Sequence, residues 1–322
     1  MTKPKRFVAA SLVGAVGGAM PDIDILIRSS SDPLLALEYH RHFTHSLAFI
    51  PIGGAMAAFC CAKLSRGRAN FRELYIPATL GWATHGLLDS CTSYGTYLYW
   101  PFSNERVAWH IVSIVDPIFT LPLLFGVIWA FRKRSARIAQ GFLLGALAYL
   151  GFGTFQLQRA EAVYTEFITE RGHTPTGVEV KPSLGNDILF RAFYEYEDHY
   201  YADAVRVNWL GESRIYPGGH HPVLDVDHYI ATHELDALQQ TDIDRFSYFS
   251  AGYIVEDPRY EGVISDFRYA ALPNDIAPMW GIDVLGTPDG EHLKREHFRD
   301  FPTEDRATFF DMLWGRESVD FR

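Results

Sequence analysis

Five long apolar stretches alternate with short polar segments along the first half of the chain. They run approximately over residues 7–27, 43–62, 74–92, 110–131 and 138–157. Each has about 20 residues, the length that an α-helix needs to cross the hydrocarbon core of a bilayer. Small residues recur within them, as in GAVGGAM and GFLLGALAYLGFG, and small residues allow membrane helices to pack closely. The pattern predicts an all-α bundle of about five transmembrane helices. The alternative is the set of buried helices in a large soluble protein.

After residue 160 the periodicity changes. Residues 190–210 alternate polar and apolar positions and are rich in aromatic and β-branched side chains, as β-strands are. Residues 261–272 and 279–285 share this pattern, whereas residues 229–240 and 304–317 have helical periodicity. The segments YPGGHHP and ALPND have the composition of turns. The pattern predicts a strand-rich α+β domain.

Charge separates the same two halves. Residues up to Arg159 contain 15 Lys and Arg against 8 Asp and Glu, whereas residues from Ala160 onward contain 14 against 31. Such asymmetry indicates two environments, and the basic residues sit in short clusters between apolar stretches, unlike a nucleic-acid-binding surface. We therefore predict two domains. Residues 1–159 form the transmembrane bundle, and residues 160–322 form an acidic extramembrane domain.

The basic loops predict the orientation. Residues 63–72, residues 132–137 and the segment before Phe7 are all basic, and with five spans they fall on one side of the membrane. The positive-inside rule makes that side the cytoplasm, so the acidic domain lies outside a bacterial cytoplasmic (inner) membrane. The first apolar stretch resembles a secretory signal, but PDID follows it without a small-residue cleavage site. We interpret it as a retained helix.

This topology places four clusters of ionisable residues at the same, outer membrane face: PDID, HRHFTHS, HGLLD and VDP. A charged group within the hydrocarbon costs roughly 2.5–3.5 kcal/mol even on the most lenient scale, and buried charges are normally paired or bound to metal. Carboxylate and imidazole ligands without thiolate suit zinc, manganese or iron(II). The clusters therefore predict a divalent-metal site, with zinc favoured. The predicted ligands are Asp22, Asp24, His40, His45, His85 and Asp89.

The spacing within the clusters leaves alternatives open. His85 and Asp89 are four apart and share a helix face, so they can share a metal, or Asp89 can orient the ring of His85. The alternative is a simple surface pair. Pro21 tends to end the first helix, which places Asp22 and Asp24 in a turn where both carboxylates can point inward. The alternative there is a pair of helix-end charges in water.

Two further residues are predicted to orient the ligands. Thr44 lies inside HRHFTHS, where it could also cap the second helix. Asp116 is predicted to lie a turn or two into the fourth helix, before Pro117, and could be a ligand, an orienting group or part of a helix kink.

These motifs resemble the bacterial inner-membrane metal-dependent hydrolase family of the YdjM/YbcI type, which is distantly similar to zinc-dependent phospholipase C. The matching segments are residues 20–24, 40–46, 85–102 and 115–124. Residues 182–208 also look like the extramembrane part of many relatives. Position 42 often holds a glycine in this family, so His42 is a departure from the pattern and is less expected to be a ligand than His40 or His45.

The resemblance implies a membrane-embedded hydrolase that uses a metal-activated water at the outer membrane face. The expected substrate is a phosphoester or a lipid-linked molecule reached from the membrane lipid, and nucleic acid is not an expected partner. The residues expected to act in catalysis are Asp24, His45, Asp89 and Arg41. Those expected to bind substrate are Arg41 and Arg106, for an anionic group, with Ser46 and Tyr94 to orient it.

Two non-enzymatic functions remain as alternatives. Intramembrane acids and histidines also form ion or proton pathways, although here the clusters crowd one membrane face. The bundle could instead anchor the acidic domain as a binding protein. In that domain GGHHPVLDVDH is the one metal-like constellation, although its spacing predicts an ordinary loop.

Overall fold

The structure is a computed structural model that describes residues 3–66, 69–298 and 301–316. Its contacts divide the chain into two compact units. The first unit contains the chain up to Ile27, Tyr39–Thr154 and Leu184–Asn186. The second contains Arg28–Glu38, Phe155–Ser183 and the chain from Asp187 onward. Helix α6 (Ala136–Arg171) runs without interruption through the predicted domain boundary between residues 159 and 160.

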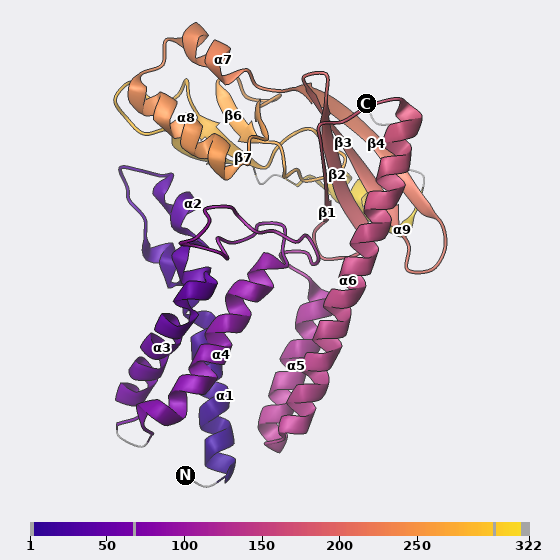
Figure 1. The fold of residues 1–322 in the computed structure, drawn as a ribbon. Helices are drawn as coiled ribbons and strands as arrows, with labels where there is room; N and C mark the ends of the chain where they lie inside the picture. Colours follow the sequence, from indigo (N-terminus) through magenta and orange to yellow (C-terminus); the bar gives the residue numbers. More distant parts are fainter. Residues whose placement is uncertain (1–2, 67–68, 299–300, 317–322) are drawn as a thin grey trace. The chain divides into compact units, whose positions relative to one another are not determined.

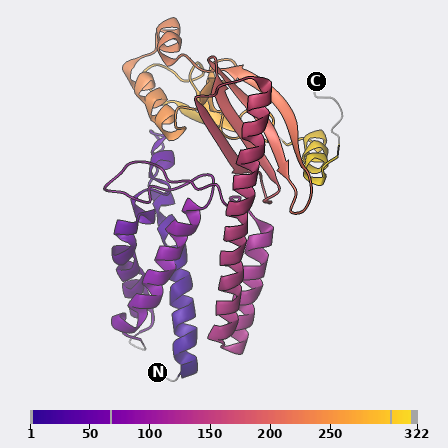
Figure 2. The same ribbon diagram turned by 45° about the vertical axis from the view of Figure 1, so that its right-hand side comes forward.

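The first unit is helical. Its long helices are α1 (Lys3–Ala19), α3 (Ile50–Leu64), α4 (Phe71–Ser90), α5 (Pro117–Lys133) and the first part of α6. Shorter elements are the 3₁₀ helices η1 (Pro21–Leu26), η2 (Phe43–His45) and η3 (Leu47–Phe49), and the short helix α2 (Leu35–Tyr39). In Figures 1 and 2, α1, α3 and α4 stand side by side, and α5 runs along α6.

Each predicted apolar stretch overlaps one of these long helices. By length and composition, two helical segments of the described residues could cross a membrane, Leu47–Leu64 and Ala136–Arg171, and Phe7–Ala19 is a shorter apolar helix. The five-span bundle therefore stays a prediction. In the predicted basic loop between the second and third stretches, residues 67 and 68 lie outside the described residues.

Close helix packing in the first unit depends on glycine. A Cβ on Gly81 of α4 would collide with the carbonyl oxygen of Gly14, so α1 and α4 meet backbone to backbone. The buried side chains of Val13, Ala78 and Trp82 fill the space beside this contact. The expectation of close packing through small residues therefore describes the α1–α4 interface.

The second unit contains two antiparallel four-stranded sheets. The first has the order β1 (Gly177–Pro182), β2 (Leu189–Tyr196), β3 (His199–Val207), β4 (Ser213–Pro222). The second has the order β5 (Ile254–Glu256), β6 (Val263–Asp266), β7 (Trp280–Asp283), β8 (Lys294–His297). The helices α7 (Val226–His233), α8 (Ala237–Phe249) and α9 (Thr303–Trp314) complete the unit. The strand-rich α+β prediction is confirmed, and residue 317 of the predicted last helix lies outside the described residues.

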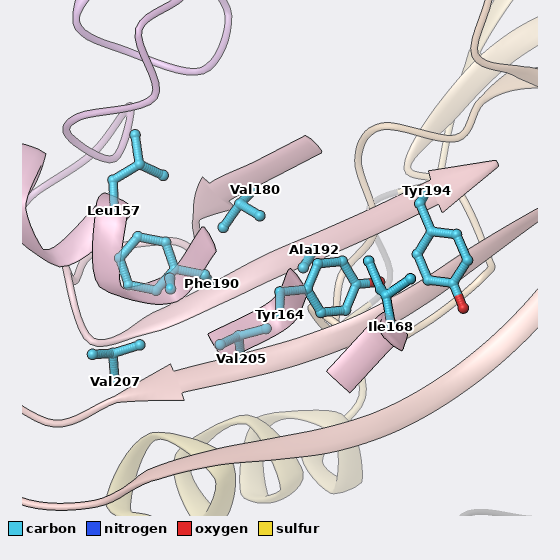
Figure 3. Close-up of a cluster of buried hydrophobic side chains, with 10 residues drawn as sticks. Leu157, Tyr164, Ile168, Val180, Phe190, Ala192, Tyr194, Val205 and Val207 are labelled. Carbon is cyan, nitrogen blue, oxygen red and sulfur yellow. The ribbon is translucent and has the colours of Figure 1, made fainter. Parts of the chain in front are cut away.

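The first sheet is covered on both faces, because alternate residues of a strand point to opposite sides. On β2, Phe190 and Ala192 pack in the cluster that includes Tyr164 of α6 (Figure 3). Their neighbours Leu189 and Phe193 pack in two clusters on the other face. The second part of α6 is therefore a core element of the sheet domain.

One predicted turn is wrong. YPGGHHP lies within strand β4, which pairs with β3 across a register shift between Tyr201 and Asp203. A Cβ on Gly218 would collide with the carbonyl oxygens of Ala202 and Asn274, so this glycine permits a close backbone approach and does not form a turn. In the neighbouring constellation, Asp225 caps α7 by accepting a hydrogen bond from the backbone N–H of His228.

The end of α6 is fixed by an ion pair whose carboxylate is buried. The Asp203 carboxylate is fully buried and accepts two hydrogen bonds from the Arg171 guanidinium, at 3.0 and 3.1 Å. It also accepts from the Tyr164 hydroxyl at 2.9 Å and from the Gly218 amide at 3.0 Å. Every acceptor direction of this carboxylate is therefore used to join α6, β3 and β4.

Replacing Arg171 with methionine should destabilise the second unit, because the Asp203 carboxylate would stay buried without its counter-charge. We expect a loss of unfolding free energy on the order of 3 kcal/mol, measured by thermal and denaturant unfolding of the full chain. The matched control is Arg316→Met, which breaks an exposed pair with Asp311 and should change stability by about 0.5 kcal/mol or less. Equal effects of the two substitutions would contradict this account of Asp203.

Candidate metal centre

Four side-chain atoms from three separate segments form a closed ring in the first unit. His45 Nε2 lies 3.5 Å from Asp22 Oδ1 and 3.3 Å from Asp89 Oδ2. His85 Nε2 lies 3.3 Å from the same Asp22 oxygen and 3.4 Å from the same Asp89 oxygen. Each residue therefore presents one candidate ligand atom to a common point.

The size of this ring fits a tetrahedral metal ion. Bonds of about 2.0–2.1 Å to histidine nitrogen and carboxylate oxygen require neighbouring ligand atoms about 3.3–3.4 Å apart. The side-chain atoms His45 Nε2, His85 Nε2 and Asp89 Oδ2 are also buried and make no hydrogen bond of good geometry, although Arg41 Nε lies 3.3 Å from Asp89 Oδ2. Because buried polar atoms are normally satisfied, a cation at the common point would complete the contacts of these atoms.

The other ring nitrogen of each histidine is held by an acceptor. His85 Nδ1 lies 2.6 Å from the carbonyl oxygen of Gly18, which can only accept, so Nδ1 carries the proton. His45 Nδ1 lies 3.2 Å from Asp24 Oδ2 and 3.0 Å from Thr44 Oγ1. When such a ring is neutral and carries its proton on Nδ1, the Nε2 lone pair faces the common point, as in most histidine–metal sites.

Asp24 organises the segment that carries His45. Its carboxylate is almost completely buried and accepts from the Arg41 backbone amide at 2.9 Å and the Thr44 hydroxyl at 2.7 Å. His40 Nδ1 lies 3.0 Å from its other oxygen. These donors occupy both carboxylate oxygens, so Asp24 is placed to orient His45.

A second group of possible ligand atoms overlaps the first. It comprises Asp22, Asp24 and His40, whose atoms lie within 4.8 Å of one another. The structure thus gathers all six predicted ligands in one place, with the four-atom ring as the arrangement that fits one ion. Direct coordination by Asp24 or His40 stays a prediction.

Local sequence features bring these segments together. Pro21 begins η1 directly after α1, which places Asp22 and Asp24 beyond the helix end. A Cβ on Gly86 would collide with the carbonyl oxygen of His45, so glycine lets α4 approach the histidine motif. The indole N–H of Trp82 donates to the Thr44 carbonyl at 2.8 Å and ties the same motif to α4.

Two arginine side chains lie beside the four ligand atoms, and both contact Tyr94. Arg41 Nε lies 3.3 Å from Asp89 Oδ2, and its Nη1 donates to the Thr92 hydroxyl at 3.2 Å. The guanidinium carbons of Arg41 and Arg106 lie 4.9 and 4.5 Å from the centre of the Tyr94 ring. The predicted substrate-binding residues Arg41, Tyr94 and Arg106 are therefore neighbours of one another and of the candidate ligand Asp89.

Ser46 and Asp116 have local structural roles. Ser46 caps η3 by accepting from the Phe49 amide. Asp116 was predicted to lie a turn or two into the fourth helix, and this position is wrong. It caps the start of α5 by accepting a hydrogen bond from the Phe119 amide at 3.0 Å. It also accepts from the Tyr149 hydroxyl at 2.7 Å. Their predicted roles in substrate binding and ligand orientation stay predictions.

His42 is placed apart from the ligand atoms. Its ring centre lies 4.5 Å from that of Tyr97, 5.5 Å from Tyr39 and 5.8 Å from Trp100. This aromatic environment supports the expectation that His42 is less suited to be a ligand than its neighbours.

Three contributors to the centre were missed from the sequence. Each involves a backbone group: the Gly18 carbonyl accepts from His85, Gly86 allows a close approach to the His45 carbonyl, and the Trp82 indole donates to the Thr44 carbonyl. The small residues of GAVGGAM predicted close packing of α1, but not which backbone group would meet which side chain.

Comparison with known proteins adds a family to this geometry. Residues 1–160 match the family model of the YdjM inner membrane protein. The uncharacterized protein YfhP of Bacillus subtilis (strain 168) is 28% identical over 127 residues, covering 39% of this chain and 38% of that protein. The inner membrane protein YbcI of Escherichia coli (strain K12) is 29% identical over 115 residues, covering 34% of this chain and 64% of that protein. The chain thus spans less than two thirds of each relative's length, and no solved structure matches it.

Removing a histidine of the four-atom ring should strongly weaken metal binding. We expect the purified full chain to bind about one divalent ion, and His45→Ala or His85→Ala to weaken zinc affinity by at least about 100-fold. This expected loss of affinity lies at or above the upper end of the range of about 10–100-fold that is typical of residues that only orient a ligand. The measurement is metal analysis with competition titration. His42→Phe is the control, because it keeps an aromatic ring in the pocket of Tyr39, Tyr97 and Trp100. A similar loss of affinity in this control would argue against the ring.

A methyl group at position 86 should separate α4 from the histidine motif. Gly86→Ala is expected to lower zinc affinity by about 10-fold or more, because ligand atoms displaced from their common point bind poorly. Gly141→Ala on α6 is the matched control, since a Cβ there meets nothing within 4 Å. If both variants bind zinc like the wild type, the close approach at Gly86 does not position the ligands.

Proposed function

We propose that this chain, whose residues 1–160 match the YdjM inner membrane protein family model, is an integral-membrane metal-dependent hydrolase of a phosphoester or lipid-linked substrate. The observation that carries the proposal is the ring of Asp22, His45, His85 and Asp89, whose separations of 3.3–3.5 Å match a tetrahedral ion. Zinc is the favoured ion, with manganese or iron(II) as alternatives.

The membrane setting is supported by the family and by the surface of the helices. Large apolar side chains are exposed on the long helices of the first unit, as on surfaces that contact lipid. They include Leu80, Leu121, Phe125, Val127 and Leu144. In the proposed topology the chain crosses the inner membrane several times, with its N-terminus in the cytoplasm and the acidic domain outside. The basic loops support this orientation.

The site is built to admit a substrate from one side. The His45 side chain is fully buried, whereas half of the Asp22 side chain is exposed, so the ring opens toward Asp22. A divalent ion held there would act as a Lewis acid and supply an activated water. His45 and His85 would hold that ion in a fixed orientation through their Nδ1 hydrogen bonds, and burial of His45 would exclude bulk water from the inner side.

The charges beside the ring favour an anionic substrate group. Arg41 and Arg106 flank Tyr94, and Arg106 is held by donating to the carbonyl oxygen of His40 at 3.0 Å. Planar guanidinium groups match the oxygens of a phosphate, which supports a phosphoester over a neutral ester. A position near the outer membrane face supports a lipid or a lipid-linked molecule as the carrier of that phosphate.

Hydrolysis can be tested on the purified chain with a soluble phosphodiester and with phospholipid vesicles, in the presence of zinc or manganese. Asp89→Asn should lower kcat/KM by at least about 100-fold, because it removes a ligand charge. Arg106→Lys should raise KM by about 10-fold with a smaller change in kcat, because lysine keeps the charge and loses the planar fork. Arg316→Met is the control, at an exposed position in the second unit.

A wild-type protein without bound metal, or an Asp89→Asn variant with unchanged activity, would contradict the hydrolase proposal. Flux of protons or divalent ions through proteoliposomes that is lost in Asp89→Asn would instead favour an ion pathway.

A further inference from the structure

The two ligand-bearing motifs are joined by a segment that belongs to the other unit. The chain leaves the first unit after Ile27, shortly beyond Asp24, and returns at Tyr39, immediately before His40. Between them, Arg28–Glu38 is part of the second unit. Leu34 and Leu37 of this segment are buried, so it is packed and does not merely link the motifs. The segment leads directly into the histidine motif, because Glu38 is followed by Tyr39 and His40.

Arg245 on α8 binds two carboxylates of this segment, those of Asp32 and Glu38. Its Nε and Nη2 donate to the two oxygens of Glu38 at 2.6 and 3.0 Å. Its Nη1 and Nη2 donate to the two oxygens of Asp32 at 3.2 and 2.9 Å. The remaining donor reaches Asp242 on the same helix at 2.7 Å. All five N–H donors of one guanidinium are thereby used, which fixes the directions of both segment carboxylates.

The charges in this cluster hold it together. Hydrogen bonding to Glu38, together with the other two carboxylates, raises the pKa of Arg245 above its ordinary value despite partial burial. Burial acts to raise the pKa of Asp32, but the hydrogen bonds and charge of Arg245 outweigh it and lower that pKa overall. His292 Nδ1 adds a contact of 2.9 Å to Asp242 and lies 4.0 Å from Asp32.

We propose that Arg245 is a positioning residue for the metal centre. By fixing Asp32 and Glu38, it sets the point at which the chain enters the histidine motif, and so holds His40 and Arg41 against Asp24. The Arg41 amide donates to Asp24 at 2.9 Å, and His40 Nδ1 lies 3.0 Å from the same carboxylate. A shift of Glu38 therefore moves the groups that orient His45.

The role of the metal in this inference rests on the proposed function, whereas the positioning itself does not require a metal. In this proposal a residue of the acidic domain, Arg245, affects the geometry of the metal centre through the chain that leads into it. It also implies reciprocity: if the cluster strengthens metal binding, a bound metal stabilises the cluster by the same free energy.

The first test reads the position of the histidine motif without any metal. Hydrogen–deuterium exchange of the full chain should be at least about 10-fold faster over residues 39–46 in Arg245→Met than in the wild type. The reason is that the Arg41 amide would no longer be held against its acceptor, Asp24. The matched control is Arg268→Met, which breaks a comparable two-bond pair with Asp266, at 2.9 and 2.7 Å, elsewhere in the same unit. It should leave exchange over residues 39–46 unchanged.

A double-substitution cycle separates positioning from general loss of stability. Asp32→Asn combined with Glu38→Gln should also speed exchange over residues 39–46, and adding Arg245→Met should speed it little further, since all three act through one cluster. If Arg245→Met does not fold, Arg245→Lys carries the same comparison with a smaller expected increase. Lysine keeps the charge but cannot make all five bonds.

The second test measures zinc affinity on the same proteins. Arg245→Met should weaken it by about 10-fold or more, within the range known for residues that orient ligands, and Arg268→Met should not. Exchange over residues 39–46 that is the same in Arg245→Met and Arg268→Met would overturn the positioning role. A wild-type chain that binds no zinc would overturn the proposed function, and the exchange result would still decide the inference about Arg245.

Discussion

The buried carboxylate of Asp24 is the constraint on which the site depends. A carboxylate removed from water is tolerated only when its oxygens are filled by donors, and here these are a backbone amide, a hydroxyl and two imidazoles. Those donors all lie within the histidine motif, so satisfying one charge folds that motif around it. His45 is then aimed at Asp22, His85 and Asp89 as a consequence, and the ring of four ligand atoms follows from the same folding event.

The family match and the candidate metal centre fall in the same part of the chain. The family model matches residues 1–160, and the ring of four ligand atoms lies entirely within that region. The segment Arg28–Glu38 belongs to the second unit, and in the sequence it connects two of the three ligand-bearing stretches. The proposed role of Arg245 depends on this connection along the chain.

Local patterns predicted the parts of the fold that local physics controls. The apolar stretches follow from their length and hydrophobicity. The end of the first helix follows from the proline at position 21, and the shared helix face of His85 and Asp89 follows from their spacing of four residues. YPGGHHP was misread as a turn because its glycines serve close contacts across a strand pair, which composition does not distinguish from turns. The Arg245–Glu38 pair, 207 residues apart in sequence, has no local signal at all. Likewise, no period could show that Asp116 caps a helix that begins one residue later.

The continuity of α6 has a consequence for how this chain can change in evolution. Its first part carries exposed apolar residues such as Leu144, and its second part places Leu157, Tyr164 and Ile168 in the sheet core. One residue inserted between Leu157 and Tyr164 would turn Tyr164 and Ile168 by about 100° relative to Leu157, so the three side chains would no longer face the sheet core together. The packing of the sheet domain therefore constrains the spacing of residues along this part of α6, and insertions and deletions can accumulate more easily in the loops.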